Sequence, residues 1–224
     1  RAMQWSFLAG LGMQAILALA QFFTQHSFAA RALGMVEHIA SVGGASVVET
    51  LNRRYLRAYG GLPHPNILGG YMAIGALVLV IIILKTPREK NIYDALKIIG
   101  MLLFLILFVS SLIVSFSRSA LIAFAVGLLI ILWQYIRQKK NSGFNIQEIW
   151  QRVVVIGLSC FFTFVVFYIF IPDILTTRVQ VETRLEQKSI IERIDSYKTA
   201  SLVWKRAWMW GTGVGNYTGV LHEL

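Results

Sequence analysis

The chain has 224 residues, of which 56% are hydrophobic and only 14% are charged. An average soluble domain has about 25% charged residues, so this composition excludes a soluble globular protein and indicates an integral membrane protein. The single cysteine excludes a disulfide framework and any metal or iron–sulfur site built from cysteines. The net charge of +10 is typical of nucleic-acid binding in a soluble protein. In an apolar chain it indicates basic cytoplasmic loops and contact with anionic membrane lipids, not nucleic acid.

Five uncharged runs are the first predicted elements, and each is long enough to cross a hydrocarbon core of about 30 Å as a helix. They cover residues 2–25, 67–84, 98–116, 119–136 and 153–172. We therefore expect an all-α fold, a polytopic bundle of about five transmembrane helices that forms a single membrane domain over residues 1–224. Gln14, Gln21 and Gln25 fall on one face of the first helix, and we expect their amides to find partners inside the bundle.

The orientation follows from the density of basic residues near the helix ends. The short loops 85–97 and 137–152 are rich in Lys and Arg, so we expect both to be cytoplasmic. Segments 26–65 and 173–224, together with the turn around Arg118, then lie on the outer side of the membrane. The chain begins without methionine or a signal peptide, and we expect it to be an internal piece of a larger protein.

Arg118 lies in the short connection Ser115–Ser119 between two spans that run in opposite directions. We expect Ser117 to cap the returning helix, whose N-terminus carries a partial positive charge beside the guanidinium group. Together these features form an anion-binding site. The alternative is an arginine that closes a hairpin and contacts lipid headgroups.

The segment Arg57–Asn66 repeats this arrangement at the start of another span. Its two X-Pro pairs favour an extended approach to the membrane, and we expect Asn66 to cap the helix that begins at Ile67. A second outward-facing helix N-terminus therefore lies near an arginine. The alternative is a capped loop with a solvated arginine.

The tail begins with Thr183–Trp210, which lacks Gly and Pro and has apolar residues at helical spacing. This pattern predicts an amphipathic helix that ends at Gly211, and its tryptophans beside Lys205 and Arg206 are typical of a membrane interface. For Arg193, within this helix, the residues alone favour a solvated ion pair. The glycine-rich segment Gly211–Asn216 favours a tight turn over a phosphate loop, because it follows a helix and no lysine closes it.

Four pieces, taken together, resemble the O-antigen ligase and O-antigen polymerase superfamily. In chain order they are Arg57 with Gly61-Leu-Pro-His-Pro-Asn66, then Ser117-Arg-Ser-Ala-Leu-Ile122, then Arg193 with its Trp-rich helix, then Gly211-x-Gly-x-Gly-Asn-Tyr217. The resemblance covers about residues 56–217. It implies a bacterial inner-membrane glycosyltransferase that moves a glycan from an undecaprenyl-diphosphate carrier to an acceptor on the periplasmic side. It also implies that no metal, nucleotide sugar or other cofactor takes part.

The resemblance further implies which residues form the site. Ligases of this family require two periplasmic arginines, and Arg118 and Arg193 are similar to them, although Ile122 replaces the leucine of the first motif. We therefore expect Arg118 and Arg193 to be catalytic. The residues expected to bind the diphosphate are Arg57, His64, Asn66, Arg118 and Arg193. The family's catalytic histidine comes well after the second arginine, so we expect the general base to lie beyond Leu224.

The charge of the leaving group agrees with these roles, because arginines and helix N-termini stabilise the negative charge that grows on a departing diphosphate. The acceptor is expected to be lipid A–core or another glycan. Within the superfamily, a polymerase that joins repeat units and a ligase that glycosylates proteins stay open as alternatives. A transporter and a non-catalytic scaffold are the alternatives from other functional classes. The five spans hold no ionisable residue, which disfavours an ion-coupled transporter.

Overall fold

The computed structural model describes residues 2–31, 34–50, 53–86, 91–141, 146–173 and 184–222. The chain divides into two compact units, Arg1–Arg178 and Val179–Leu224. Among the described residues, the secondary structure is helical except for two short β-hairpins. This confirms the expected all-α fold class.

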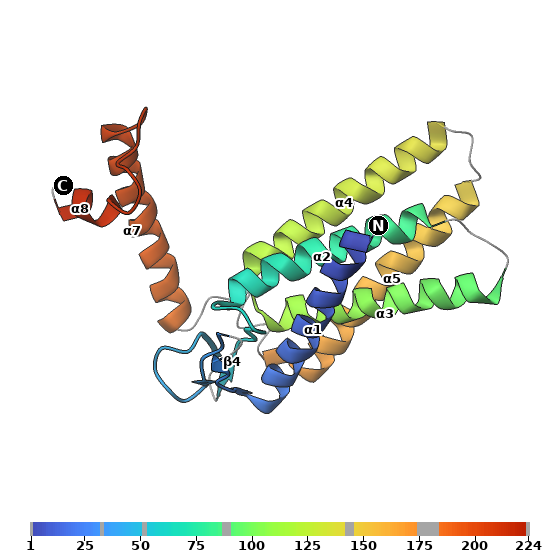
Figure 1. Cartoon of the computed structure of the whole chain (residues 1–224), viewed down its shortest axis with the longest axis horizontal. Helices are drawn as coiled ribbons and strands as arrows, with labels where there is room; N and C mark the ends of the chain where they lie inside the picture. The colour runs from blue at the N-terminus through green and yellow to red at the C-terminus, as the bar shows by residue number, and fades with distance from the viewer. Residues whose placement is uncertain are drawn as a thin grey trace. The chain divides into compact units, whose positions relative to one another are not determined.

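The first unit contains five long helices that run back and forth (Figure 1). They are α1 (Ala2–Thr24), α2 (Pro65–Lys85), α3 (Ile92–Val114), α4 (Arg118–Asn141) and α5 (Ile146–Phe170). All five are long and apolar enough to cross a membrane, which confirms the expected polytopic helix bundle.

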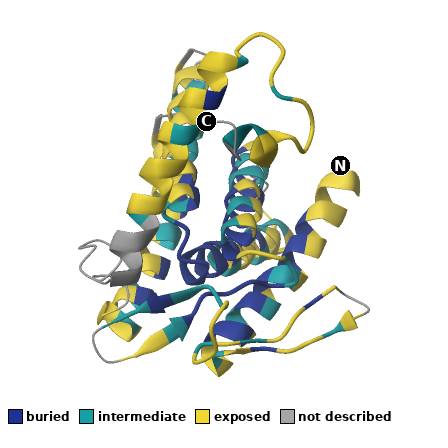
Figure 2. Cartoon of the chain, turned by 90° about the vertical axis from the view of Figure 1, so that its left-hand side faces the viewer, coloured by how far each residue is buried: buried dark blue, intermediate teal, exposed yellow. Residues whose placement is uncertain are grey.

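The core of the bundle lies around α2 and α3, about half of whose residues are buried. α2 packs against α3 and α4, and α3 also packs against α1 and α5. By contrast, α4 and α5 expose most of their length, including large apolar side chains such as Ile130, Phe161 and Phe170. Buried residues accordingly face inward and exposed ones outward (Figure 2). Apolar outer faces of this kind suit a lipid surrounding.

The helices run past the uncharged runs that predicted them, so the loop assignment is wrong for several basic residues. Lys97 lies within α3, Arg137 within α4 and Arg152 within α5. Lys and Arg are good helix formers, and their long side chains let the charge reach beyond the apolar layer. Arg88 and Lys90, also predicted to lie in a cytoplasmic loop, fall outside the described residues.

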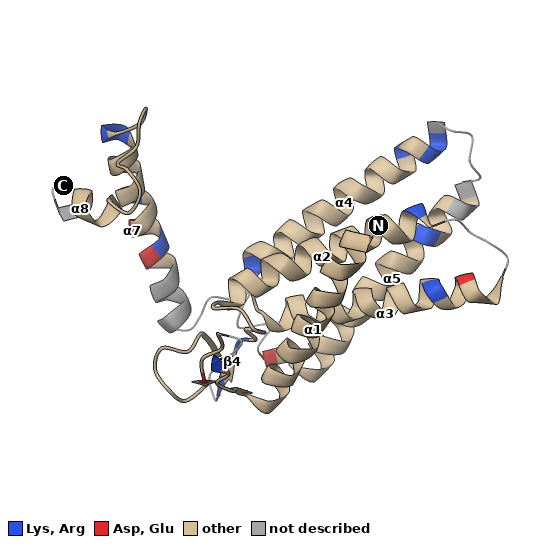
Figure 3. Ribbon diagram, in the orientation of Figure 1, with Lys and Arg blue, Asp and Glu red and all other residues tan. Residues whose placement is uncertain are grey.

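One end of the bundle is basic (Figure 3). There Arg152 donates hydrogen bonds from Nη1 to the carbonyl oxygens of Ile83, Leu84 and Thr86, at 3.2, 2.9 and 2.7 Å. Carbonyl groups at a helix C-terminus lack partners within the helix and carry partial negative charge. Arg152 therefore closes the end of α2 and ties α5 to it.

The opposite end of the bundle carries the segment that connects α1 to α2 (Figure 1). It contains two antiparallel hairpins, which the sequence patterns did not predict because each strand is only two or three residues long. The strands are β1 (His26–Ser27) with β2 (His38–Ile39), and β3 (Val47–Glu49) with β4 (Arg54–Leu56). In the second hairpin Val48 lies opposite Tyr55.

The second unit contains α7 (Arg184–Arg206) and the short α8 (Tyr217–His222). The predicted helix 183–210 therefore ends early, and the turn after it includes Trp208 and Trp210. Gly211 is left-handed, with φ of 68°, and donates its N–H to the carbonyl of Ala207 at 2.9 Å. Residues 207–210 form this turn and not a last turn of helix, so α7 ends at Arg206. Thr183 lies outside the described residues.

Candidate functional site

The N-termini of α2 and α4 lie side by side at the end of the bundle opposite the basic one (Figure 1). Gly69, near the start of α2, makes this approach possible. A Cβ atom on Gly69 would lie 2.8 Å from Ser115 Oγ, 2.9 Å from Ser117 Cβ and 3.1 Å from Ala120 Cβ. Neither helix has an acidic residue in its first turn. Two partially positive helix ends are thus brought together without a carboxylate in either first turn.

His64, not Asn66, is the N-cap of α2, so the predicted cap is wrong. The helix begins at Pro65, and His64 Nδ1 accepts the backbone N–H of Asn66 at 3.1 Å. Proline is favoured at the first helical position because its missing N–H is not needed there. Pro65 was therefore the signal in the sequence that places the cap at His64.

The cap also fixes the proton position on His64. Because Nδ1 accepts a hydrogen bond, the neutral ring carries its proton on Nε2. Desolvation of the ring and, second, the charge of Arg57 lower the pKa of His64 below its usual value. At neutral pH, His64 is therefore an uncharged donor at its Nε2.

Arg57 is buried and connects three separate segments of the chain. Its Nε donates to the carbonyl oxygen of Ser115 at 2.9 Å, its Nη1 to Ser46 Oγ at 3.1 Å and its Nη2 to Asn66 Oδ1. Because His64 and not Asn66 is the N-cap, the side chain of Asn66 does not cap the helix. Asn66 lies in the first turn of α2, and its Oδ1 accepts the bond from Arg57. The structure thus brings Arg57, Asn66 and the turn between α3 and α4 together.

Gln14 and Gln21 of α1, with Gln25 just after it, hold the segment that carries Arg57. Gln21 is fully buried, and its Oε1 accepts the N–H groups of Tyr59 and Gly60 at 3.0 and 2.9 Å. Gln14 Oε1 accepts from Gly61, and Gln25 Oε1 accepts from Leu56. The expectation that these amides find partners is confirmed, although these partners are backbone groups of the segment between α1 and α2 and not other helices. The expectation that Gln25 lies within the first helix is wrong, because α1 ends at Thr24 and Gln25 is left-handed, with φ of 56°. These bonds orient Arg57 because they fix the backbone on both sides of it.

Arg118 is the first residue of α4 and is partly buried. The turn before it is sharp, because Phe116 takes a left-handed conformation with φ of 49° and Ser115 Oγ bonds back to Leu112 at 2.7 Å. Ser117 precedes the helix, and its carbonyl accepts from Leu121 at 3.0 Å, while its hydroxyl lies 3.4 Å from Ser119 Oγ. A cation at a helix N-terminus opposes the helix dipole by about 0.3–1 kcal/mol. An anion bound at the same helix N-terminus interacts favourably with the helix dipole.

Arg193 lies on α7 in the second unit and is exposed. The solvated ion pair that the residues alone favoured is not found within the described part of the chain. On the same helix, Lys198 pairs with Asp195 at 3.5 Å. Arg193 is thus an exposed guanidinium group on a helix that also exposes apolar side chains such as Ile191 and Ile194.

A comparison with protein-family models agrees with the motifs. The model described as O-antigen ligase matches residues 102–223, which is more than half of the chain. The chain belongs to the O-antigen ligase family. The matched part includes Arg118 and Arg193, whereas the Arg57–Asn66 segment precedes it. No curated protein and no solved structure matches the chain.

Membership in the O-antigen ligase family establishes a membrane protein with ligase- or polymerase-type function. Its partners are, in general terms, a lipid-linked glycan and a polysaccharide acceptor. The sequence patterns missed Ser46 and Ser115, which accept hydrogen bonds from Arg57. For Ser115 the acceptor is a backbone carbonyl, which every residue has, so no signal in the sequence could mark it.

The close approach at Gly69 gives a first prediction. We expect Gly69→Ala to separate α2 from the turn that leads into α4, and to lower both the melting temperature and glycan transfer. Ser117 Cβ and Ala120 Cβ cannot rotate away from the added methyl group, because both are fixed to the backbone. Gly70→Ala is the matched control, since a Cβ there meets nothing within 4 Å and alanine favours a helix by about 1 kcal/mol. Equal melting temperatures for the two variants would contradict this account.

Proposed function

We propose that this protein transfers a glycan from an undecaprenyl-diphosphate carrier to lipid A–core or another glycan acceptor, at the periplasmic face of the bacterial inner membrane. The observation that carries this proposal is the pairing of two helix N-termini with Arg57 and Arg118 at one end of the bundle. The basic residues at the other end support its orientation, because such residues favour the cytoplasmic side.

The reaction breaks the bond between the anomeric carbon of the glycan and the bridging oxygen of the diphosphate. The electron pair stays on that oxygen, so negative charge grows on the diphosphate, which Arg118 at the start of α4 is proposed to bind. Arg193 is proposed as a second catalytic residue, as the resemblance implies. Fixed donors of this kind lower the barrier because they need no reorganisation as the charge develops. An acceptor hydroxyl forms the new bond and gives its proton to a general base.

The other three residues have distinct proposed roles. His64 offers its Nε2–H to a phosphate oxygen, as an uncharged donor beside the start of α2. Arg57 donates a hydrogen bond to Asn66, so Asn66 orients the buried guanidinium group. The charge of Arg57 adds positive potential to the site. A site of this composition at the membrane surface binds the anionic diphosphate while the polyprenyl chain stays in the bilayer.

Reconstitution tests the proposed function directly. Full-length protein in liposomes, supplied with undecaprenyl-diphosphate-linked glycan and lipid A–core, is expected to yield glycosylated lipid A–core. Release of undecaprenyl diphosphate should match the product formed. If the donor is consumed but no glycosylated lipid A–core forms, the protein is not a ligase. Chains longer than the supplied glycan would indicate a polymerase.

The orientation gives a second prediction. In a Cys160→Ala background, we expect a cysteine at Val42 to react with a membrane-impermeant maleimide in intact spheroplasts. A cysteine at Lys140 should react only after permeabilisation. Val42 is exposed on the segment between α1 and α2, and Lys140 lies in the last turn of α4. The reverse labelling pattern would overturn the periplasmic placement of the site.

A further inference from the structure

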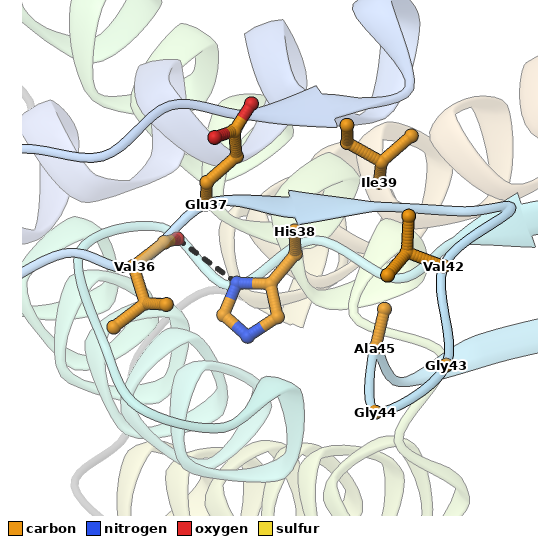
Figure 4. A pocket seen from close by; sticks show the side chains of 8 residues that line it. All are labelled: Val36, Glu37, His38, Ile39, Val42, Gly43, Gly44 and Ala45. Atoms are coloured by element: carbon orange, nitrogen blue, oxygen red, sulfur yellow. Dashed lines mark hydrogen bonds between the residues drawn. The ribbon is translucent and has the colours of Figure 1, made fainter.

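A pocket of about 370 Å³ lies in the segment between α1 and α2 (Figure 4). It is lined by residues 36–39 and 42–45, which belong to β2 with its flanking residues and to the turn that follows. Ligand pockets in proteins have volumes from about 300 Å³ upward. The lining includes no lysine or arginine, so the pocket is not itself a site for a diphosphate.

His38 gives the pocket its polar character. Its Nδ1 donates to the carbonyl oxygen of Val36 at 3.0 Å, because a carbonyl can only accept. In the neutral ring, Nε2 is therefore an acceptor, and among the described residues nothing donates to it. The ring stacks on Tyr59 with centroids 4.2 Å apart. Glu37 extends to the other side of the strand (Figure 4), where it pairs with His26 at 2.9 Å.

The remaining walls are small or apolar. Val36, Val42 and Ala45 present aliphatic groups, and Gly44 is left-handed, with φ of 93°. A Cβ on Gly44 would meet nothing within 4 Å. The pocket thus combines a fixed acceptor with aliphatic walls, which fits a sugar ring that has hydroxyl groups on its edge and C–H groups on its faces.

The pocket is directly linked to Arg57. Ser46, the residue after the pocket lining, accepts from Arg57 Nη1 at 3.1 Å, and its carbonyl accepts the Arg57 N–H at 3.1 Å. The N–H of Ser46 donates to Tyr59 Oη at 2.6 Å, and Tyr59 supports the His38 ring. One wall of the pocket and the buried guanidinium are therefore parts of one hydrogen-bonded unit.

We infer that this pocket binds the sugar attached to the diphosphate of the donor, with a sugar hydroxyl donating to His38 Nε2. The inference rests on the proposed function, since Arg57 joins Ser46, next to the pocket lining, to Asn66 in the first turn of α2, where the diphosphate is proposed to bind. It assigns the choice of donor sugar to His38 and Val42, which the family match does not include. Sugars without a hydroxyl group at the position that faces His38 bind less tightly.

Two probes test this inference on full-length protein in nanodiscs. One is a short-chain prenyl diphosphate that carries a single N-acetylglucosamine, and the other is the same prenyl diphosphate without a sugar. Val42→Trp fills the pocket and should weaken binding of the glycosylated probe at least about tenfold, with the sugar-free probe unchanged. His38→Phe keeps the stack on Tyr59, removes the acceptor and should show the same selectivity. Phe28→Trp, an exposed position outside the pocket, is the matched control.

The outcomes separate the inference from the proposed function. If Val42→Trp and His38→Phe leave both probes unchanged, or weaken both equally, the pocket is not a sugar site. In that case the proposed function stands, provided that Arg118→Ala weakens the sugar-free probe. If Arg118→Ala also leaves both probes unchanged, the diphosphate is not held at the helix ends, and both proposals are wrong.

Discussion

Arg118→Ala in the full-length protein is expected to lower the rate of glycan transfer by about 10²–10³-fold, which is the usual effect of removing one fixed donor to a developing anion. Arg118 begins α4, so its guanidinium and the helix N-terminus act on the same region. The loss should appear in kcat more than in KM, because the negative charge is greatest in the transition state. Membrane insertion and melting temperature should change little, since the side chain is only partly buried.

Arg137→Ala is the matched control for this experiment. It removes an arginine from the same helix at its other end, where the guanidinium lies 5.6 Å from the Trp133 ring centroid. We expect glycan transfer by this variant to stay within about twofold of the wild type, since surface substitutions rarely matter more than about 0.5 kcal/mol. Comparable losses in both variants would show that Arg118 acts through general electrostatics or folding and not at the reacting diphosphate.

Lysine at position 118 refines the same test. It keeps the charge but loses the planar fork that binds two phosphate oxygens at once. We expect Arg118→Lys to recover only part of the lost activity. Full recovery would mean that charge alone is needed, which favours the alternative in which Arg118 contacts lipid headgroups.

The helices and the position of Arg118 could be predicted because both depend on local composition. An uncharged run of about twenty residues has few options other than a membrane helix. The single short break between two such runs places Arg118 at a helix start. The ends of the helices were predicted less well, because Arg152 and Lys97 are basic but helical. Charge marks the edge of the apolar layer, and a helix continues through that edge.

The contacts of the candidate site could not be read from the sequence, because most of them involve backbone atoms. Arg57 and Ser115 are far apart in the chain, and the group that accepts from Arg57 is a carbonyl. Gln21 likewise bonds to the backbone of Tyr59 and Gly60. Such bonds depend on how the loop folds against α1 and α3, which residue types do not specify. The pocket beside His38 was not predicted either, because its strands are too short to give a sequence pattern.

Arg57→Met is expected to destabilise the protein by about 3 kcal/mol, because hydrogen bonds from a charged donor contribute about 1.5–3 kcal/mol each and a buried acceptor without a partner adds a penalty. The carbonyl of Ser115 would lose this donor at a fully buried position. Asn66 and Ser46 would lose their bonds as well, and the three segments that meet at Arg57 would loosen. Thermal unfolding in detergent, followed by circular dichroism, measures the change.

Arg54→Met is the control, because Arg54 lies three residues before Arg57, at the start of β4, and its exposed side chain pairs with Glu49 at 3.6 Å. We expect its melting temperature to stay near that of the wild type, since exposed ion pairs contribute little. Arg57→Met should therefore lose stability and glycan transfer together, whereas Arg118→Ala should lose transfer alone. If Arg57→Met melts like the wild type but cannot transfer glycan, its guanidinium contacts the diphosphate directly and the three bonds do not stabilise the fold. If it keeps both stability and transfer, Arg57 belongs neither to the framework of the site nor to its chemistry.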